Sequence, residues 1–361
     1  MRIALVNDTS LALEALRRVL ATEPRHSIAW IARDGEEAVR RTALDRPDLI
    51  LMDLLMPGVD GVEATRRIMA ATPCPILIVT ASVGARPGLV YEALGVGALD
   101  AIRTPSLLEP AAQAGTALLR RIRQLERLTQ PTAPVPLPSA VPSCRAPQVA
   151  RASAGSNHVR LTPSRPAGPP LIAIGSSTGG PAALVGCLAP LPTDLGAAVL
   201  VAQHIEAQFA PGLARWLNDQ IALPVEIVRE GDPPRPGKVQ LAASNDHLVL
   251  RRDGRLGYSP EPLQEPYRPS VNALFRSLLQ PGMRPGLAVL LTGMGRDGGQ
   301  GMLSLRQAGW HTIAQDESSC SVYGMPRAAV ELGAAVEVLP PDAIARSLLR
   351  RRFGMGSQAR C

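Results

Sequence analysis

Three scarcities in the sequence each exclude a class of protein. Phe, Trp and Tyr make up 3% of the 361 residues, which leaves few rings for stacking on nucleic-acid bases. Apolar runs such as AAVLVA and LAVLLTGM are far shorter than the ~18 residues that suggest a membrane span. The five cysteines form no C-x-x-C pair, and the N-terminus MRIALVND is typical of a strand and not of a secretory leader, so no disulfide framework is predicted. We therefore expect a soluble, cytoplasmic protein with no membrane insertion.

The charge balance is positive but indicates no particular partner. The formal net charge is +7, which would permit binding to nucleic acid. Much of the excess lies in residues 130–170 and in LLRRRF near the C-terminus, and no helix-turn-helix pattern follows. We predict no nucleic-acid partner, although an output that binds nucleic acid stays open as an alternative.

Proline is spread through one stretch that divides the chain. Residues 129–170 contain no acidic residue and no periodicity, a composition typical of flexible linkers. A chain of 361 residues usually forms more than one domain. We predict one domain at 1–128, a Pro-rich flexible linker at 129–170 and a second domain at 171–352.

Both domains show the alternation of short apolar runs with helical patterns that is typical of α/β folds. Before the linker, five such units predict a parallel five-stranded sheet with helices on both faces. Their strands are expected at Ile3–Val6, Ile28–Ile31, Leu49–Met52, Ile76–Val79 and Ala98–Ile102, with a last helix over Glu109–Leu128. After the linker, a longer series predicts a doubly wound α/β domain with an antiparallel portion near residues 238–258.

Polar residues follow the predicted strands of the first domain, where ligands of such sheets bind. Asn7, Asp8, Asp53, Thr80 and Thr104 lie at these strand ends. Asp8 and Asp53 with one backbone carbonyl would make an all-oxygen site suited to Mg²⁺. An aspartate beside Mg²⁺ can also accept a phosphoryl group.

The stretch LMDLLMPGVDG resembles the phosphoacceptor loop of response-regulator receiver domains, which have a flavodoxin-like fold. The resemblance implies Asp53 as phosphoacceptor, Asp8 as a second metal ligand and Thr80 as the hydroxyl switch residue. Two positions depart from the family pattern: Asn7 replaces an acidic residue, and Thr104 replaces a lysine that acts as a point charge on phosphate. The alternative is a degenerate receiver that serves only as a packing partner.

The segment IGSSTGGP after the linker is a strand, a Gly-rich turn and the start of a helix. It lacks the lysine of a P-loop and the spacing of a dinucleotide turn, so a hydroxyl nucleophile is the better interpretation. Ser176 and Ser177 are both candidates from spacing alone. A nucleophile needs a histidine and an orienting carboxylate. His204 and Asp297 follow other predicted strands and are expected at the same sheet edge. His247 and His311 stand at the start of predicted strands and are the less favoured alternatives to His204.

This set of motifs resembles the methylesterase domain of the chemotaxis protein-glutamate methylesterases, the CheB family. The segments that carry it are IGSSTGGP, AQHI, EGDPPRPGKVQLA, RPSVNALFRSL, LTGMGRDGGQGM and IAQDESSCSVYGMPRAAVELGA. The resemblance implies Ser177 as nucleophile, His204 as general base and Asp297 as its orienter. It further implies an oxyanion hole from backbone amides near Thr178 and Met294, and no cofactor for the esterase. Asn272 stands where the family has an aspartate, and we expect it not to contact the three catalytic residues.

The resemblance as a whole implies a phosphorylation-regulated protein-glutamate methylesterase. It would hydrolyse glutamate γ-methyl esters on methyl-accepting chemoreceptors, with deamidation of receptor glutamines as a related activity, and would receive its phosphoryl group from a CheA-type histidine kinase. The pair Asn7 and Asp8 and the stretch GALDAIRTP favour the Wsp-type surface-sensing branch. A non-catalytic, receptor-binding output is the competing interpretation.

Overall fold

The computed structural model describes residues 1–81, 87–107, 115–129 and 168–351. The predicted linker at 129–170 therefore lies almost wholly outside the described residues. Within the described residues, no helix combines the length and the apolar character that crossing a membrane requires.

The N-terminal domain is the predicted parallel sheet, with strands in the order β2-β1-β3-β4-β5. The strands are β1 (Arg2–Val6), β2 (Ser27–Ala32), β3 (Leu49–Met52), β4 (Ile76–Thr80) and β5 (Asp100–Arg103). The helices are α1 (Ser10–Ala21), α2 (Gly35–Leu44), α3 (Gly61–Ala71), α4 (Pro87–Gly95) and α6 (Thr116–Thr129). All five predicted strands are confirmed. The helix predicted over Glu109–Leu128 corresponds to α6, which begins at Thr116, and the predicted start at Glu109 lies outside the described residues.

Apolar side chains explain why helices cover both faces of this sheet. Strand β3 is buried at all four positions, as expected for a parallel strand with both faces covered. The buried face of α1 packs with α6 in one hydrophobic cluster, and α2, α3 and α4 contribute to another. The carboxyl ends of the strands are thereby left as the open edge.

The C-terminal domain contains a seven-stranded sheet in the order β14-β13-β12-β6-β7-β9-β8, and every pairing in it is parallel. Its strands are β6 (Leu171–Ser176), β7 (Ala198–Gln203), β8 (Val225–Ile227), β9 (Val239–Leu241), β12 (Leu287–Leu290), β13 (His311–Gln315) and β14 (Glu337–Leu339). The helices are α7 (Gly180–Leu188), α8 (Ala210–Gln220), α9 (Val271–Ser277), α10 (Gly299–Gln307), α11 (Met325–Glu331) and α12 (Pro341–Arg350). The strand order reverses at β6, which makes its carboxyl end the expected binding point.

One prediction for this domain was partly wrong. The antiparallel portion is only the hairpin of β10 (His247–Leu250) and β11 (Leu256–Ser259). The predicted strand at 238–242 instead joins the main sheet as β9, parallel to β7 and β8. Its three residues are all buried: Val239 and Leu241 belong to a hydrophobic cluster, and the Gln240 side chain contacts the loop at Pro233 and Arg235. An apolar run by itself does not reveal strand direction.

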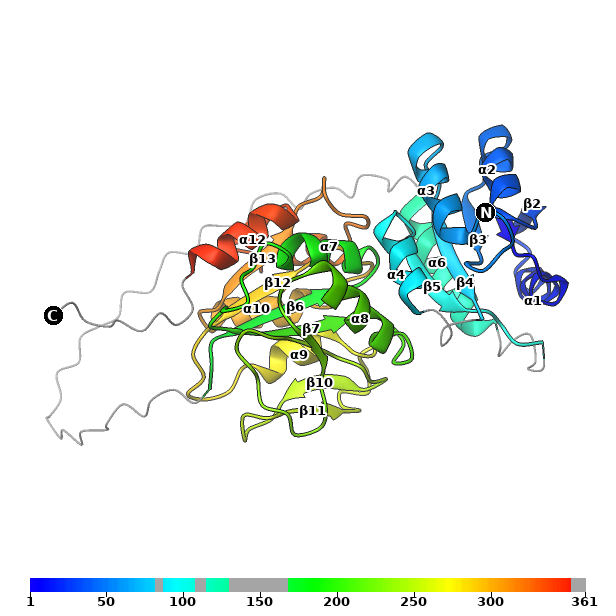
Figure 1. Cartoon of the computed structure of the whole chain (residues 1–361). Coiled ribbons are helices and arrows are strands. Elements are labelled where there is room, and N and C mark those ends of the chain that lie inside the picture. The colour runs from blue at the N-terminus through cyan, green and yellow to red at the C-terminus, as the bar shows by residue number, and fades with distance from the viewer. Residues whose placement is uncertain (82–86, 108–114, 130–167, 352–361) are drawn as a thin grey trace, which may run out of the picture.

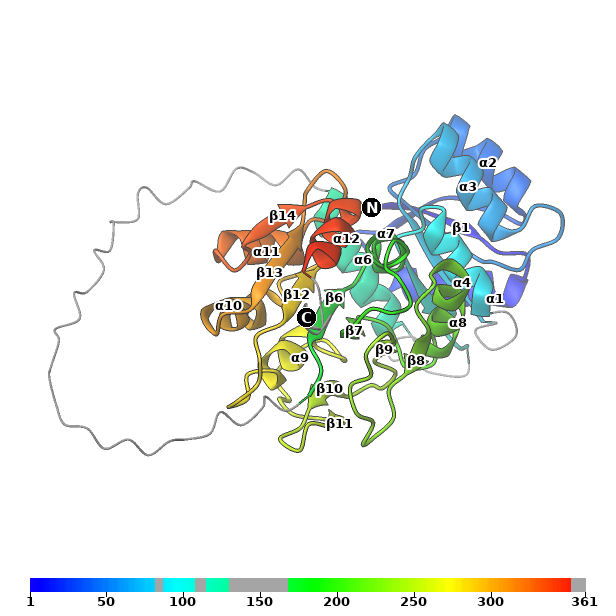
Figure 2. The same ribbon diagram turned by 60° about the vertical axis from the view of Figure 1, so that its left-hand side comes forward.

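Helices α7, α8 and α12 cover one face of the large sheet, and α9, α10, α11 and the hairpin cover the other (Figures 1 and 2). The two domains meet where α4 packs against α8. The hydroxyl of Tyr91 donates a hydrogen bond to the carbonyl of Phe209 at 2.6 Å, and its ring lies 6.1 Å from that of Trp216. Apolar residues of both domains therefore form one continuous cluster.

Candidate active site

Ser177 lies directly after β6, in the turn that starts α7. Its N–H donates to the carbonyl of Thr292 at 3.0 Å, and its own carbonyl accepts from the N–H of Gly180 at 2.8 Å. Between them, Gly179 has a φ of 75°, a left-handed conformation that favours glycine. The turn thus holds the serine at the carboxyl edge of the sheet, beside the N-terminus of a helix.

The two candidate serines have different surroundings. The Ser176 hydroxyl donates to Oε1 of Gln203 at 2.6 Å, and Nε2 of Gln203 donates to the carbonyl of Ser177 at 2.8 Å. Ser176 is fully buried, and its hydroxyl is committed to this network. Ser177 instead lines a small cavity together with His204; no hydrogen bond joins the two side chains in the described part of the chain.

His204 follows β7, and its N–H donates to the carbonyl of Ser176 at 2.9 Å. Its Nε2 lies 2.7 Å from Oδ2 of Asp297. The other ring nitrogen, Nδ1, is buried and has no hydrogen-bond partner among the described residues. An imidazole held in this way by a carboxylate has one nitrogen left to accept a proton.

Asp297 is held at the N-terminus of α9. Its carboxylate accepts hydrogen bonds from the Ser270 hydroxyl at 3.0 Å and from the N–H groups of Val271, Asn272 and Gly298 at 2.7, 2.9 and 2.9 Å. Burial raises the pKa of Asp297, but the His204 contact and the N–H donors outweigh it and hold the pKa below its ordinary value. The carboxylate therefore stays charged and oriented toward the imidazole.

The expectation for Asn272 was wrong in one respect. Its backbone N–H contacts Asp297, although its side chain does not: the side-chain Oδ1 accepts from the N–H of Gly301 at 2.8 Å. The position thus supports the carboxylate through the backbone, which any residue except proline could supply, and this backbone role is not visible from the residue type.

The amides predicted for an oxyanion hole lie beside Ser177. A Cβ on Gly293 would come within 2.7 Å of the Cβ of Ser177, so only glycine allows the 293–294 backbone to pass this close. The amides of Thr178 and Met294 donate to no acceptor within the described ranges. Unpaired N–H groups beside the nucleophile are the kind of donor that a developing oxyanion requires.

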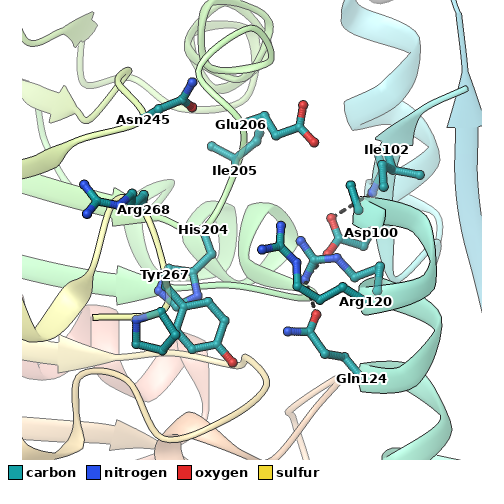
Figure 3. Close-up of a pocket in the computed structure, with 14 residues that line it drawn as sticks. Asp100, Ile102, Arg120, Gln124, His204, Ile205, Glu206, Asn245, Tyr267 and Arg268 are labelled. Carbon is teal, nitrogen blue, oxygen red and sulfur yellow. Dashed lines mark hydrogen bonds and ion pairs between the residues drawn. The ribbon is translucent and has the colours of Figure 1, made fainter. Parts of the chain in front are cut away.

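Three supporting residues were missed by sequence reasoning: Gln203, Tyr267 and Ser270. Gln203 ties the two strand ends together, and Ser270 both caps α9 and donates to Asp297. The quoted motifs AQHI and RPSVNALFRSL contain two of them, but no spacing rule assigns their contacts. The ring of Tyr267 stacks on the imidazole of His204, as Figure 3 shows.

The N-terminal domain covers this site. Ser177 and His204 share a cavity of only about 10 Å³ with Leu94, Leu99 and Asp100 of that domain, the lower limit for one water molecule. A larger cavity of about 430 Å³ lies next to His204 and is lined from both domains (Figure 3). Where the N-terminal domain lines this cavity, the Asp100 carboxylate forms an ion pair with the Arg121 guanidinium at 3.0 Å. A substrate chain has no room at Ser177 in this arrangement.

The second candidate site lies at the carboxyl edge of the small sheet. Asp53 follows β3, and its Oδ2 accepts from the Asn7 side-chain amide at 2.9 Å, while Oδ1 accepts from the N–H of Leu54 at 2.8 Å. Burial raises the pKa of Asp53 and the negative charge of Asp8 raises it further, against hydrogen bonds from Leu54 and Thr80. The structure therefore brings Asn7, Asp8, Asp53 and Thr80 together.

These residues fit a divalent cation in part. A bound cation would neutralise the two carboxylates, and exposed Asp8 leaves room for the waters that Mg²⁺ retains. Against this, the Asn7 amide N–H groups face Asp53 and cannot ligate a cation unless the amide turns. The described residues contain no cluster of three or more His, Cys, Asp or Glu side chains suited to a metal. Thr104, next to Thr80, has a buried hydroxyl without a hydrogen-bond partner in the described chain.

Comparison with known proteins covers both domains. Residues 172–348 match the family model described as CheB methylesterase, and residues 3–109 match the response regulator receiver domain. A protein-glutamate methylesterase/protein-glutamine glutaminase 2 of Cupriavidus metallidurans is 49% identical over 352 residues, which are 97% of this chain and 98% of that protein. A protein of the same name from Burkholderia lata is 48% identical over 357 residues, with the same coverage of 97% and 98%. The crystal structure of the Thermotoga maritima CheB methylesterase catalytic domain aligns with 50% of this chain and 98% of its own, at 32% identity and a TM-score of 0.48.

Proposed function

This chain belongs to the CheB methylesterase family, and on that premise we propose that Ser177, His204 and Asp297 are the triad of a protein-glutamate methylesterase. The observation that carries the assignment is the contact between His204 Nε2 and Asp297 at 2.7 Å, beside a serine in a glycine turn. The proposed domains are a receiver at 1–128 and a methylesterase at 171–352, joined by a flexible linker.

Each residue has a defined part in the proposed reaction. The Ser177 oxygen attacks the γ-carbonyl carbon of a methyl-esterified glutamate as its proton passes to Nδ1 of His204, and Asp297 stabilises the imidazolium. The amides of Thr178 and Met294 hold the oxyanion, and each such donor typically contributes about 10²–10³ in rate. The imidazolium then protonates the departing methanol, and water hydrolyses the glutamyl ester of Ser177 by the same steps.

The proposed substrates are glutamate methyl esters of methyl-accepting chemoreceptors. Because the related proteins are named both methylesterase and glutaminase, the same acyl transfer would release ammonia from receptor glutamines. A CheA-type histidine kinase would supply the phosphoryl group, and the Wsp-type branch stays a prediction. The cytoplasm is the proposed location, since Cys74, Cys187 and Cys320 are all free thiols in the structure.

Methanol release tests this function. A chemoreceptor cytoplasmic domain, esterified by a receptor methyltransferase, is incubated with the full chain, with and without acetyl phosphate and Mg²⁺ to relieve the docked state, and methanol and ammonia are measured in the same reaction. We expect methanol from the esterified domain and none from the same domain before esterification. A folded chain that releases no methanol from several esterified receptors would contradict the proposal and favour a non-catalytic, receptor-binding output.

Regulation follows from the domain contact. With the receiver seated on α8, the cavity at Ser177 is too small for a substrate, so the docked arrangement is the proposed inactive state. The contact combines the buried Tyr91 hydrogen bond to Phe209 with an apolar cluster, and phosphorylation at the far edge of the receiver would loosen it. At the phosphorylation site, Asp53 and Asp8 would hold Mg²⁺, which would supply positive charge for the phosphoryl oxygens.

Phosphorylation of Asp53 is expected despite the two altered positions. Acetyl phosphate with Mg²⁺ should add one phosphoryl group to the full chain, measured as intact mass, because Asp53 is nucleophilic once a cation offsets its neighbouring charge. The adduct should be absent in Asp53→Asn and after chelation of Mg²⁺. Asp60→Asn is the matched control, since asparagine also caps α3. No adduct in the wild type would identify the domain as a packing partner only, and an adduct that persists in Asp53→Asn would assign the phosphoryl group to another residue.

A further inference from the structure

Tyr267 covers one face of the imidazole that the proposed reaction uses. The two rings are parallel within 7°, and their centroids are 4.4 Å apart. Figure 3 shows the phenol ring lying over His204 at the wall of the larger cavity. The imidazole therefore has Asp297 at one nitrogen and an aromatic face along its plane.

The tyrosine ring is set by the two loops that also carry the triad. Its hydroxyl lies against Gly295, where an added Cβ would come within 2.6 Å of it, and Gly295 stands between Met294 and Asp297. Its own backbone leads through two residues into Ser270, which donates to Asp297. The ring is thus placed by the same backbone that places the carboxylate and the proposed oxyanion donor.

The stacked tyrosine ring can affect the imidazole in two ways: by stabilising its positive charge and by fixing its plane. During acylation the imidazole becomes an imidazolium, and the face of an aromatic ring attracts a cation placed over it. The same ring blocks rotation of the imidazole out of its plane, so Nε2 keeps its contact with Asp297 and Nδ1 keeps its direction. Tyr267 is half-buried and lies at the wall of the larger cavity.

We propose that Tyr267 is a positioning residue for the general base: its ring fixes the plane of the His204 imidazole and stabilises the imidazolium formed when Ser177 is deprotonated. This inference rests on the proposed function of the same site. The proposal assigns the effect on His204 to the aromatic face of Tyr267 and not to its hydroxyl. Phenylalanine at this position should therefore preserve the effect, and leucine should lose it.

The test measures the reactivity of Ser177 without a receptor. The full chain, with acetyl phosphate and Mg²⁺ present to relieve the docked state, is treated with a fluorophosphonate, and phosphonylated protein is followed by intact mass at several pH values, with Ser177→Ala as the baseline. Probe concentrations are kept low enough that the labelling rate stays proportional to the probe concentration. The charged groups that face the imidazole are unchanged in every variant: Asp100, Arg120, Arg121, Glu206, Arg268 and Asp297.

Tyr267→Phe should label within about twofold of the wild type, whereas Tyr267→Leu should label about 5- to 30-fold more slowly, the loss expected for a desolvated cation–π contact. Leucine still covers the imidazole but offers no π face, so a slower leucine variant beside an unchanged phenylalanine variant isolates the contribution of the aromatic face. Melting temperatures check that each variant folds, and Tyr267→Met replaces the leucine variant if that one does not.

Two results would overturn the proposal: a leucine variant that labels like the wild type at every pH, or a phenylalanine variant as slow as the leucine one, which would assign the effect to the hydroxyl. Wild-type chain that is not labelled above the Ser177→Ala baseline would overturn the proposed nucleophile as well. That outcome can be told apart from failure of the Tyr267 proposal alone, because it is seen in the wild-type chain, without any substitution at Tyr267.

Discussion

Replacing Ser177 by alanine is expected to lower methanol release by about 10⁵-fold or more, as removal of a triad nucleophile does in serine hydrolases. The adjacent variant Ser176→Ala is expected to keep the rate within about one order of magnitude. The difference arises because the Ser176 hydroxyl is buried and bonded to Gln203, whereas Ser177 lies in the cavity that contains His204.

The two serine variants serve as controls for each other. Ser176→Ala leaves Oε1 of Gln203 without its donor, which should cost about 1–3 kcal/mol of folding free energy, measurable by urea denaturation. Ser177→Ala removes no hydrogen bond of its side chain among those found in the described chain and should unfold like the wild type. Loss of methanol release in Ser176→Ala with full activity in Ser177→Ala would reverse the assignment of the nucleophile.

Asp297→Asn is expected to reduce methanol release by about 10³- to 10⁴-fold, as a carboxylate-to-amide change does in related triads. The carboxylate now accepts from His204, from the Ser270 hydroxyl and from three N–H groups. An amide supplies only one accepting oxygen, and its NH₂ group would face donors. The imidazole would then lose both its orientation and the charge that stabilises the imidazolium.

The same substitution at Asp253, which accepts from the N–H of Arg255 in an exposed turn, is the matched control and should leave the rate unchanged. Circular dichroism and thermal melting would show whether Asp297→Asn still folds, and Asp297→Ala provides a second variant that introduces no donor. An asparagine variant that keeps more than about a tenth of the wild-type rate would mean that another group orients the base.

The sequence by itself determined the α/β architecture and predicted where both candidate sites lie. Apolar runs separated by helical patterns predicted the parallel strands, and residues directly after those runs must share one edge, because parallel strands end on the same side of a sheet. Ser177, His204 and Asp297 are far apart in the chain but follow β6, β7 and β12, which are neighbours in the sheet. The same reasoning predicted that Asp8 and Asp53 lie close together.

Only the tertiary structure decided which atoms meet at those edges. Three contacts depend on side-chain directions at the strand ends and in loops: Nε2 of His204 contacts Asp297, Tyr267 stacks on the imidazole, and Gln203 accepts a hydrogen bond from the Ser176 hydroxyl. The direction of β9 and the seating of α4 on α8 were also beyond the sequence pattern. Periodicity records how a segment is buried, whereas these features arise from packing between segments that are distant in the chain, so the chemistry of each contact appears only when the fold brings its partners together.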